Sequence, residues 1–181
     1  MTTPPDPERC KRLLAEAGYK GEPVVFLVAA DYPSVHAEGV VVADGWRKAG
    51  FNVDLQMLDG GTETHRVASR EPLSKGGWSA YCAYTTGLST MNPSAHNNLR
   101  GSGNTATFGW PDIPRLEALR NAWFDASGVA AQAAVSREMQ LVAFETLPNM
   151  PLGIFYQPTA YGNNLTDIPR GFAQFYGVRR T

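Results

Sequence analysis

Hydrophobic and polar positions follow a regular order over the stretch Cys10–Asp59. An amphipathic helical stripe ends at Gly18, a common helix-stopping residue. The apolar, valine-rich run Pro23–Ala30 has the length and branching of a buried strand. Apolar residues then recur every three or four positions over Val35–Ala49, and Asn52–Leu58 alternates strictly. The pattern therefore predicts helix, strand, helix and strand in that order.

A strand–helix–strand unit of this kind indicates the fold class. One helix joins the two strands, so they should be parallel with a right-handed crossover. Asp6 followed by Pro7 is a good start for the first helix, because Asp caps the helix and Pro fits its first turn. We therefore predict an α/β fold with a mostly parallel sheet flanked by helices.

The remaining chain contains weaker signals of the same kind. Gly, Asn, Ser and Thr fill a long segment from Thr85 to Trp110, and loops this long in compact domains are usually functional. The other predicted elements are a short helix over Thr62–Arg70, a strand over Trp78–Tyr84, a helix starting at Asp112–Pro114, a helix over Val129–Leu147 and a short strand over Pro151–Tyr156.

Composition excludes several classes of partner. The 181 residues have a net charge of −1 and no basic or acidic run, which argues against nucleic acid and against an anionic membrane surface. The polar, proline-rich start of the sequence does not resemble a signal peptide. Cys10 and Cys82 leave a disulfide open, but two separate thiols are the favoured interpretation.

Catalytic chemistry has little support in the sequence. His36, His65 and His96 do not have the spacing of metal ligands. Cys82 could pair with His96 as a nucleophile, but neither lies in a recognisable motif, and a cysteine within a strand is usually buried and inert. The glycine pairs lack the strand–loop–helix context of a phosphate site. We therefore expect no enzyme activity, no metal and no cofactor.

Four landmarks in order support a family resemblance. They are Leu13–Tyr19 (LLAEAGY) before the first strand, Trp46–Leu55 (WRKAGFNVDL), Gly76–Trp78 followed by Asn92-Pro93, and Leu147–Gly153 (LPNMPLG) followed by Gln157–Tyr161 (QPTAY). Together they cover nearly the whole chain, which resembles the C-terminal part of the family 5 extracellular solute-binding proteins. These are the peptide-, nickel- and oligosaccharide-binding components of ABC importers.

The resemblance implies one lobe of a two-lobe, type II periplasmic binding protein fold. Residues 1–157 would form the second lobe, and residues 158–181 would return to a first lobe that this chain lacks, with a hinge near Pro151–Gln157. It also implies periplasmic capture of a small solute, such as a peptide-like or other polar molecule, for a membrane permease. A truncated lobe would expose apolar surface and self-associate. The alternative is a stand-alone protein-interaction or regulatory domain that reuses this lobe.

Ligand specificity is where the chain departs from the family. Peptide-binding members usually carry an Asp soon after the Gly-Trp strand, which pairs with the amino terminus of the peptide. Between Trp78 and Asn104 this chain has no acidic residue. The departure puts peptide specificity in question.

Open α/β sheets bind ligands beyond the carboxyl ends of their strands, so the loops Ala30–Pro33, Asp59–Thr62 and Tyr84–Asn98 should face the cleft. The candidate ligand-binding residues are Tyr32, Asp59, Trp78, Tyr84, Asn92, His96 and Asn97. Each has a structural alternative. Trp78 is as suited to packing as to stacking on a ligand, Asp59 suits a helix cap, and the amides and His96 suit loop turns. Alternation along the predicted strand places Trp78 and Tyr84 on one face and Tyr81 on the other.

Overall fold

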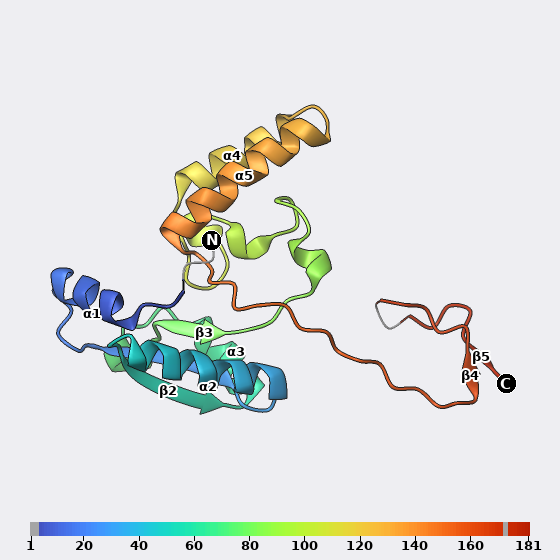
Figure 1. Cartoon of the computed structure of the whole chain (residues 1–181), viewed down its shortest axis with the longest axis horizontal. Helices are drawn as coiled ribbons and strands as arrows, with labels where there is room; N and C mark the ends of the chain where they lie inside the picture. Colours follow the sequence, from blue (N-terminus) through green and yellow to red (C-terminus); the bar gives the residue numbers. More distant parts are fainter. Residues whose placement is uncertain (1–3, 172–173) are drawn as a thin grey trace. The chain divides into compact units, whose positions relative to one another are not determined.

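The computed structural model describes residues 4–171 and 174–181 (Figure 1). Internal contacts divide the chain into two compact units, with the division between Met150 and Pro151. The first unit contains α1 (Pro7–Glu16), β1 (Pro23–Ala29), α2 (Pro33–Lys48), β2 (Asn52–Leu58), α3 (Gly60–Val67), β3 (Ala80–Cys82), α4 (Pro114–Asp125) and α5 (Val129–Thr146). Four 3₁₀ turns lie at Leu73–Lys75, Gly87–Thr90, Asn97–Leu99 and Gly103–Thr105.

The sheet of the first unit has three strands in the order β2-β1-β3. Both pairings are parallel, with Val24 opposite Val53 and Phe26 opposite Ala80. The predicted α/β class with a parallel sheet and flanking helices is therefore confirmed. Among the described residues, no helix is long and apolar enough to cross a membrane.

Helices cover both faces of β1, which explains its continuous apolar sequence. Phe26 and Val28 point to the face covered by α2, where the Phe26 ring lies 4.9 Å from the ring of Trp46. Val25 and Leu27 point to the opposite face, where Val67 of α3 packs. A strand buried on both sides needs apolar residues at odd and even positions alike.

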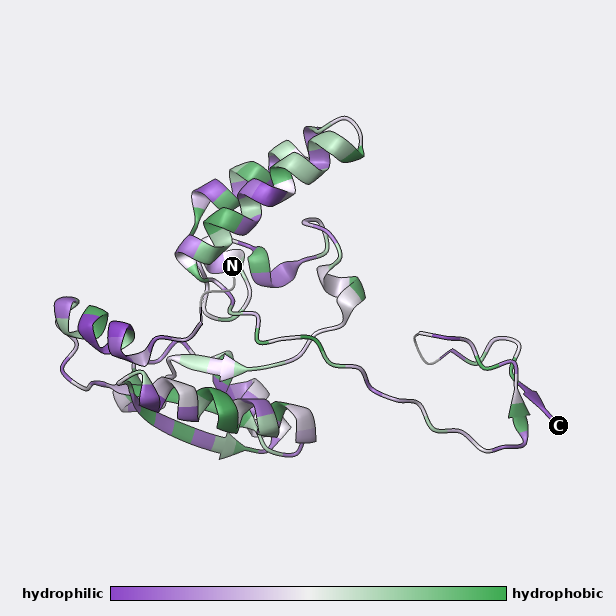
Figure 2. Ribbon diagram, in the orientation of Figure 1, coloured by the Kyte–Doolittle hydropathy of each residue, from purple (hydrophilic) through white to green (hydrophobic). Residues whose placement is uncertain are grey.

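Strand β2 lies at the edge of the described sheet and keeps the alternation predicted for it. Figure 2 shows hydrophilic and hydrophobic residues in turn along its ribbon. Val53, Leu55 and Met57 pack into the core on the α2 side. Because α3 has only eight residues, it leaves polar residues of β2 uncovered on the other side.

Helices α4 and α5 lie side by side as a hairpin joined by a short turn (Figure 1). They have a small core of their own, formed by Leu116, Met139 and Val142. The buried guanidinium of Arg120 donates to the carbonyl of Leu99 at 2.9 Å. This bond attaches the hairpin to the long segment that precedes it.

Two sequence expectations need correction. Strand β3 is confined to Ala80–Cys82, and Trp78 and Tyr84 lie outside it. Residues 151–156 form no strand, because no neighbouring strand pairs with them, and Ile154 and Tyr156 are about nine-tenths exposed at 87% and 90%. Apolar residues alone do not make a strand without a hydrogen-bonding partner.

The second unit, Pro151–Thr181, is small. Its described regular structure is an antiparallel pair of two-residue strands, β4 (Leu165–Thr166) and β5 (Arg179–Arg180). The turns and short extended pieces predicted beyond Gln157 are thus confirmed. The predicted division at 157/158 refers to a lobe outside this chain and stays a prediction.

Candidate functional site

The three predicted loops meet at one edge of the sheet. Strands β1, β2 and β3 are parallel and end at Ala29, Leu58 and Cys82, so the segments that follow them emerge together. The backbone N–H of Ala30 donates to the carbonyl of Leu58 at 2.7 Å and ties the first two segments together. We call this region the carboxyl edge.

Two tyrosines from different loops meet at the carboxyl edge. Tyr32 precedes α2 and Tyr84 follows β3, and their ring centroids lie 6.2 Å apart in an edge-on arrangement. The two side chains are about half exposed, at 46% and 47%. A large apolar ring with a hydroxyl at its tip can contact both the apolar and the polar parts of a solute.

Asp59 lies at the same edge and caps α3. Its carboxylate accepts a hydrogen bond from the N–H of Thr62 at 2.9 Å. Contacts with Thr62, first through the side chain and then through the backbone, lower the pKa of Asp59 below its usual value. The structural role offered for Asp59 is confirmed, and a ligand role stays a prediction.

Of the candidates in the long loop, Asn92 forms hydrogen bonds within the loop itself. The side-chain oxygen of Asn92 accepts from the N–H groups of Ser94 and Ala95 at 3.0 and 3.2 Å, which is a turn-forming pattern. His96 is half-buried, and burial followed by the positive charge of Arg120 lowers its pKa. Asn97 is exposed and begins a 3₁₀ turn. Ligand contacts by these three residues stay a prediction.

Trp78 lies before β3 and therefore at its amino end, away from Tyr84. Its ring packs edge-on against Tyr81 at 5.3 Å and lies 6.3 Å from the ring of Trp110. The predicted facing of Trp78 with Tyr84 and against Tyr81 is wrong. Two-residue alternation holds only inside an extended strand, and this strand begins at Ala80.

Two acidic residues at the carboxyl edge were not among the sequence candidates. Asp31 lies two residues after the end of β1, and Glu63 lies on the buried face of α3 with Gly60 and Val67. Glu63 is only 8% exposed, and burial followed by the charge of Asp31 raises its pKa. A charged residue at a core-facing helix position was the available signal, since the spacing 60, 63 and 67 is that of a buried stripe.

Cys82 does not have the surroundings of a nucleophile. It is buried on the α2 side, and burial followed by the charges of Glu38 and Glu63 raises the pKa of its thiol to about 11. Reactive cysteines have lowered pKa values and positive surroundings. Cys10 is exposed, and neither cysteine forms a disulfide.

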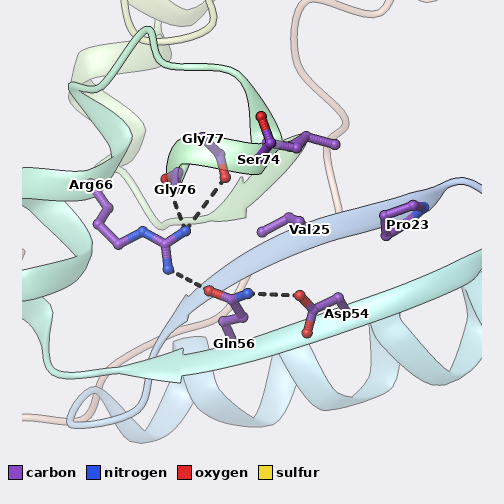
Figure 3. Close-up of a pocket in the computed structure, with 9 residues that line it drawn as sticks. Pro23, Val25, Asp54, Gln56, Arg66, Ser74, Gly76 and Gly77 are labelled. Carbon is purple, nitrogen blue, oxygen red and sulfur yellow. Dashed lines mark hydrogen bonds between the residues drawn. The ribbon is translucent and has the colours of Figure 1, made fainter.

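A hollow of about 610 Å³ lies on the α3 side of the sheet, over the amino halves of β1 and β2 (Figure 3). Arg66 is one of its lining residues, and its guanidinium donates to the side-chain oxygen of Gln56 and to the carbonyl of Gly76, the latter at 3.0 Å. The Gln56 amide in turn donates to Asp54 at 2.7 Å. These polar groups of the hollow are therefore hydrogen-bonded to one another. None of the sequence candidates lines the hollow.

Comparison with known proteins identifies the family. Residues 1–107 match the model of the bacterial extracellular solute-binding proteins, family 5 Middle. The chain belongs to this family. A probable peptide ABC transporter periplasmic-binding protein of Sinorhizobium fredii is 34% identical to it over 163 residues, which are 90% of this chain and 31% of that protein.

Solved structures of other binding proteins share the fold of this family 5 protein. The nickel-complex structure of NikA from Staphylococcus aureus aligns with a TM-score of 0.64 and 16% identity over 82% of this chain and 31% of that one. AgaA from A. tumefaciens R10, in complex with agropinic acid, aligns with a TM-score of 0.63 and 19% identity. The alignment covers 78% of this chain and 28% of that one. CtaP from Listeria monocytogenes aligns with a TM-score of 0.61 and 14% identity over 76% of this chain and 28% of that one.

These alignments confirm the type II periplasmic binding protein fold expected from the sequence. They also show that the chain spans about a third of the length of its relatives. Among the residues that the structure describes, no group of three or more His, Cys, Asp or Glu side chains is arranged to hold a metal ion.

Proposed function

We propose that this chain supplies one wall of the solute-binding cleft of an ABC importer's periplasmic substrate-binding protein, which delivers a small polar solute to a membrane permease. The observation that carries the proposal is the meeting of Tyr32, Asp59 and Tyr84 at the carboxyl edge of a parallel sheet. Ligands of open α/β sheets bind at this edge.

The family membership supports the class of function, and the side chains at the edge support the class of solute. Tyrosine rings and hydroxyls, carboxylates and exposed backbone groups suit a molecule with both apolar and polar parts. Closure of a second lobe over this wall would bury much more of the ligand than the wall alone can. We therefore expect the single wall to bind weakly, with a Kd on the order of 1–10 mM.

NMR can test the proposal at such weak affinity. The ¹⁵N-labelled 181-residue protein would be titrated with short peptides, amino acids and sugars, each up to a few tens of millimolar, on the order of the expected Kd. Amide shifts should concentrate in residues 30–33, 59–62 and 83–85. A Tyr32→Ala variant should weaken the response, and Leu73→Ala, beside the hollow of Figure 3, is the control.

Two results would refute the proposal. One is the absence of shifts with every class of solute. The other is a set of shifts confined to the hollow around Arg66 and unchanged by Tyr32→Ala, which would place binding at the other end of the strands.

A further inference from the structure

We propose that the carboxyl edge recognises a positively charged group of the solute, an ammonium or a guanidinium, through Asp31 and Glu63. The inference rests on the proposed function and narrows it to cationic organic solutes. It assigns the cation contact to the loop after β1 and to α3, and not to the loop after β3.

The first observation is an unpartnered buried carboxyl group. Glu63 is more than nine-tenths buried, and its Oε1 atom has no hydrogen-bond partner among the described residues. A buried charged oxygen without a donor costs stability, since its hydration is lost and nothing replaces it. A donor from a bound solute would remove that cost.

The second observation concerns the face of α3 on which Glu63 lies. Gly60, one turn earlier on the same face of α3, approaches the first loop so closely that an added Cβ would lie 2.7 Å from the Tyr32 ring and 3.3 Å from both Asp31 carboxylate oxygens. Residues three apart share a helix face, so Glu63 lies on the face of α3 that approaches the first loop, and the charge of Asp31 is close enough to raise the pKa of Glu63, after the larger effect of burial. Cys82, at the end of β3, also lies within reach of the Glu63 charge. Burial raises the pKa of Cys82 most, and the charges of Glu38 and then Glu63 raise it further.

The third observation is that no cationic side chain compensates these acids. Residues 23–46, 49–65 and 76–99, which include all three loops of the carboxyl edge, contain no Lys or Arg. Arg66, three residues after Glu63 on α3, donates instead to Gln56 and to the carbonyl of Gly76. No ion pair forms on Asp31 or Glu63 within the part of the chain that the structure describes. Helix capping explains the presence of a carboxylate at Asp59. It does not explain Glu63, because the Oε1 atom of Glu63 accepts no hydrogen bond from the described residues.

The aromatic pair completes the arrangement. The Tyr32 and Tyr84 rings lie at the same edge, and the face of a tyrosine ring attracts a cation. A solute cation beside Asp31 would therefore meet its carboxylate, the nearby carboxyl group of Glu63 and the aromatic rings of the same edge.

The test compares matched probes in NMR titrations of the full chain. Alanyl-alaninamide carries an ammonium, its N-acetyl derivative is neutral, and N-acetyl-alanyl-alanine carries a carboxylate. We expect the ammonium probe to bind about tenfold more tightly than the neutral one, which is the effect of one charge-assisted contact, and the anionic probe to bind most weakly.

Charge-neutralising variants locate the effect. Asp31→Asn and Glu63→Gln should each remove most of the preference for the cation. Asp54→Asn, the same kind of change on β2 beside the hollow of Figure 3, is the matched control and should leave the preference unchanged.

A readout of stability separates recognition from a purely structural role. Neutral Gln no longer bears the cost of a buried charge, so Glu63→Gln should raise the melting temperature at pH 7 while it weakens the cation probe. If Glu63 had a purely structural role, Glu63→Gln would lower the melting temperature and the affinity for the cation probe together.

The outcomes distinguish the two proposals. Equal binding of all three probes, or a preference that survives both variants, overturns this inference and leaves the proposed function standing. The absence of binding by any probe or by any solute of the broader screen overturns both.

Discussion

Replacing Gly39 with alanine should destabilise the first unit, although alanine favours helices. Gly39 lies in α2 where that helix crosses β1. A Cβ atom there would lie 2.6 and 2.7 Å from the two methyl carbons of Val28 and 3.2 Å from its Cβ. Rotating Val28 does not relieve the overlap, because all three atoms of its side chain are too close and the residue is fully buried at 0% exposure.

The magnitude follows from two opposing effects. Overpacking of a filled core costs about 1–3 kcal/mol of unfolding free energy. The better helix propensity of alanine returns about 0.8–1 kcal/mol. Gly45→Ala in the same helix provides the matched control, because nothing lies within 4 Å of its added Cβ. Only the propensity effect acts there, so Gly45→Ala should be stabilising.

The difference between the two variants isolates the packing term, because the propensity gain cancels. We expect the free energy of unfolding of Gly39→Ala to be about 1–3 kcal/mol lower than that of Gly45→Ala. For a domain of this size the difference corresponds to a Tm lower by about 2–12 °C. Urea and thermal unfolding, followed by tryptophan fluorescence at low protein concentration, would measure it. Equal stabilisation by the two substitutions would refute the packing of α2 on β1 described here.

A double-mutant cycle sharpens the result. Val28→Ala alone should destabilise the protein by opening a cavity. In the Gly39→Ala background it should cost less, because it removes the two methyl carbons that the new Cβ meets. Additive effects would show that residues 28 and 39 are not in contact.

Further predictions concern cysteine reactivity, pH and association. Iodoacetamide should label the exposed Cys10 readily and Cys82 only after unfolding, because burial and nearby acids raise the Cys82 pKa to about 11; fast double labelling of folded protein would contradict this. The folded-state pKa of Asp59 is lowered, so its stabilising effect is complete above the unfolded value of about 3.9 and is lost as the pH falls through the folded value. Asp59→Asn should retain the cap but remove this part of the pH dependence in acid titrations of Tm, and an unchanged profile would refute the assignment. The exposed Ile154 and Tyr156 should promote self-association that rises with concentration in light scattering; a strict monomer at high concentration, or association unaffected by aspartate at both positions, would count against it.

Much of the fold follows from local patterns. The unbroken apolar sequence of β1 requires cover on both faces, and the alternation of β2 requires one apolar face, so sequence alone predicts a parallel unit with a helical crossover. Asp6 and Asp59 cap helices because a carboxylate before a helix satisfies its first N–H groups. These relations depend on residues a few positions apart.

Relations between distant segments were harder to predict. Alternation over Trp78–Tyr84 assumed a long strand, but β3 has only three residues, and Trp78 instead packs on Tyr81. The apolar residues after Met150 suggested a strand, but among the described residues they pair with no other segment. In each case the outcome depended on a partner segment that the local pattern does not specify.

The sequence by itself determined the α/β class, the parallel order of the first two strands and the family, because these depend on periodicity and on motifs in fixed order. The sequence also placed the three loops at one edge, but only the tertiary structure showed that the Tyr32 and Tyr84 rings meet, that Gly60 approaches Asp31 and that Glu63 is buried beside this edge. Parallel pairing aligns strand ends that are tens of residues apart in the chain. That alignment turns three separate loops into one surface, and it leaves the buried charge of Glu63 without a partner from the described chain.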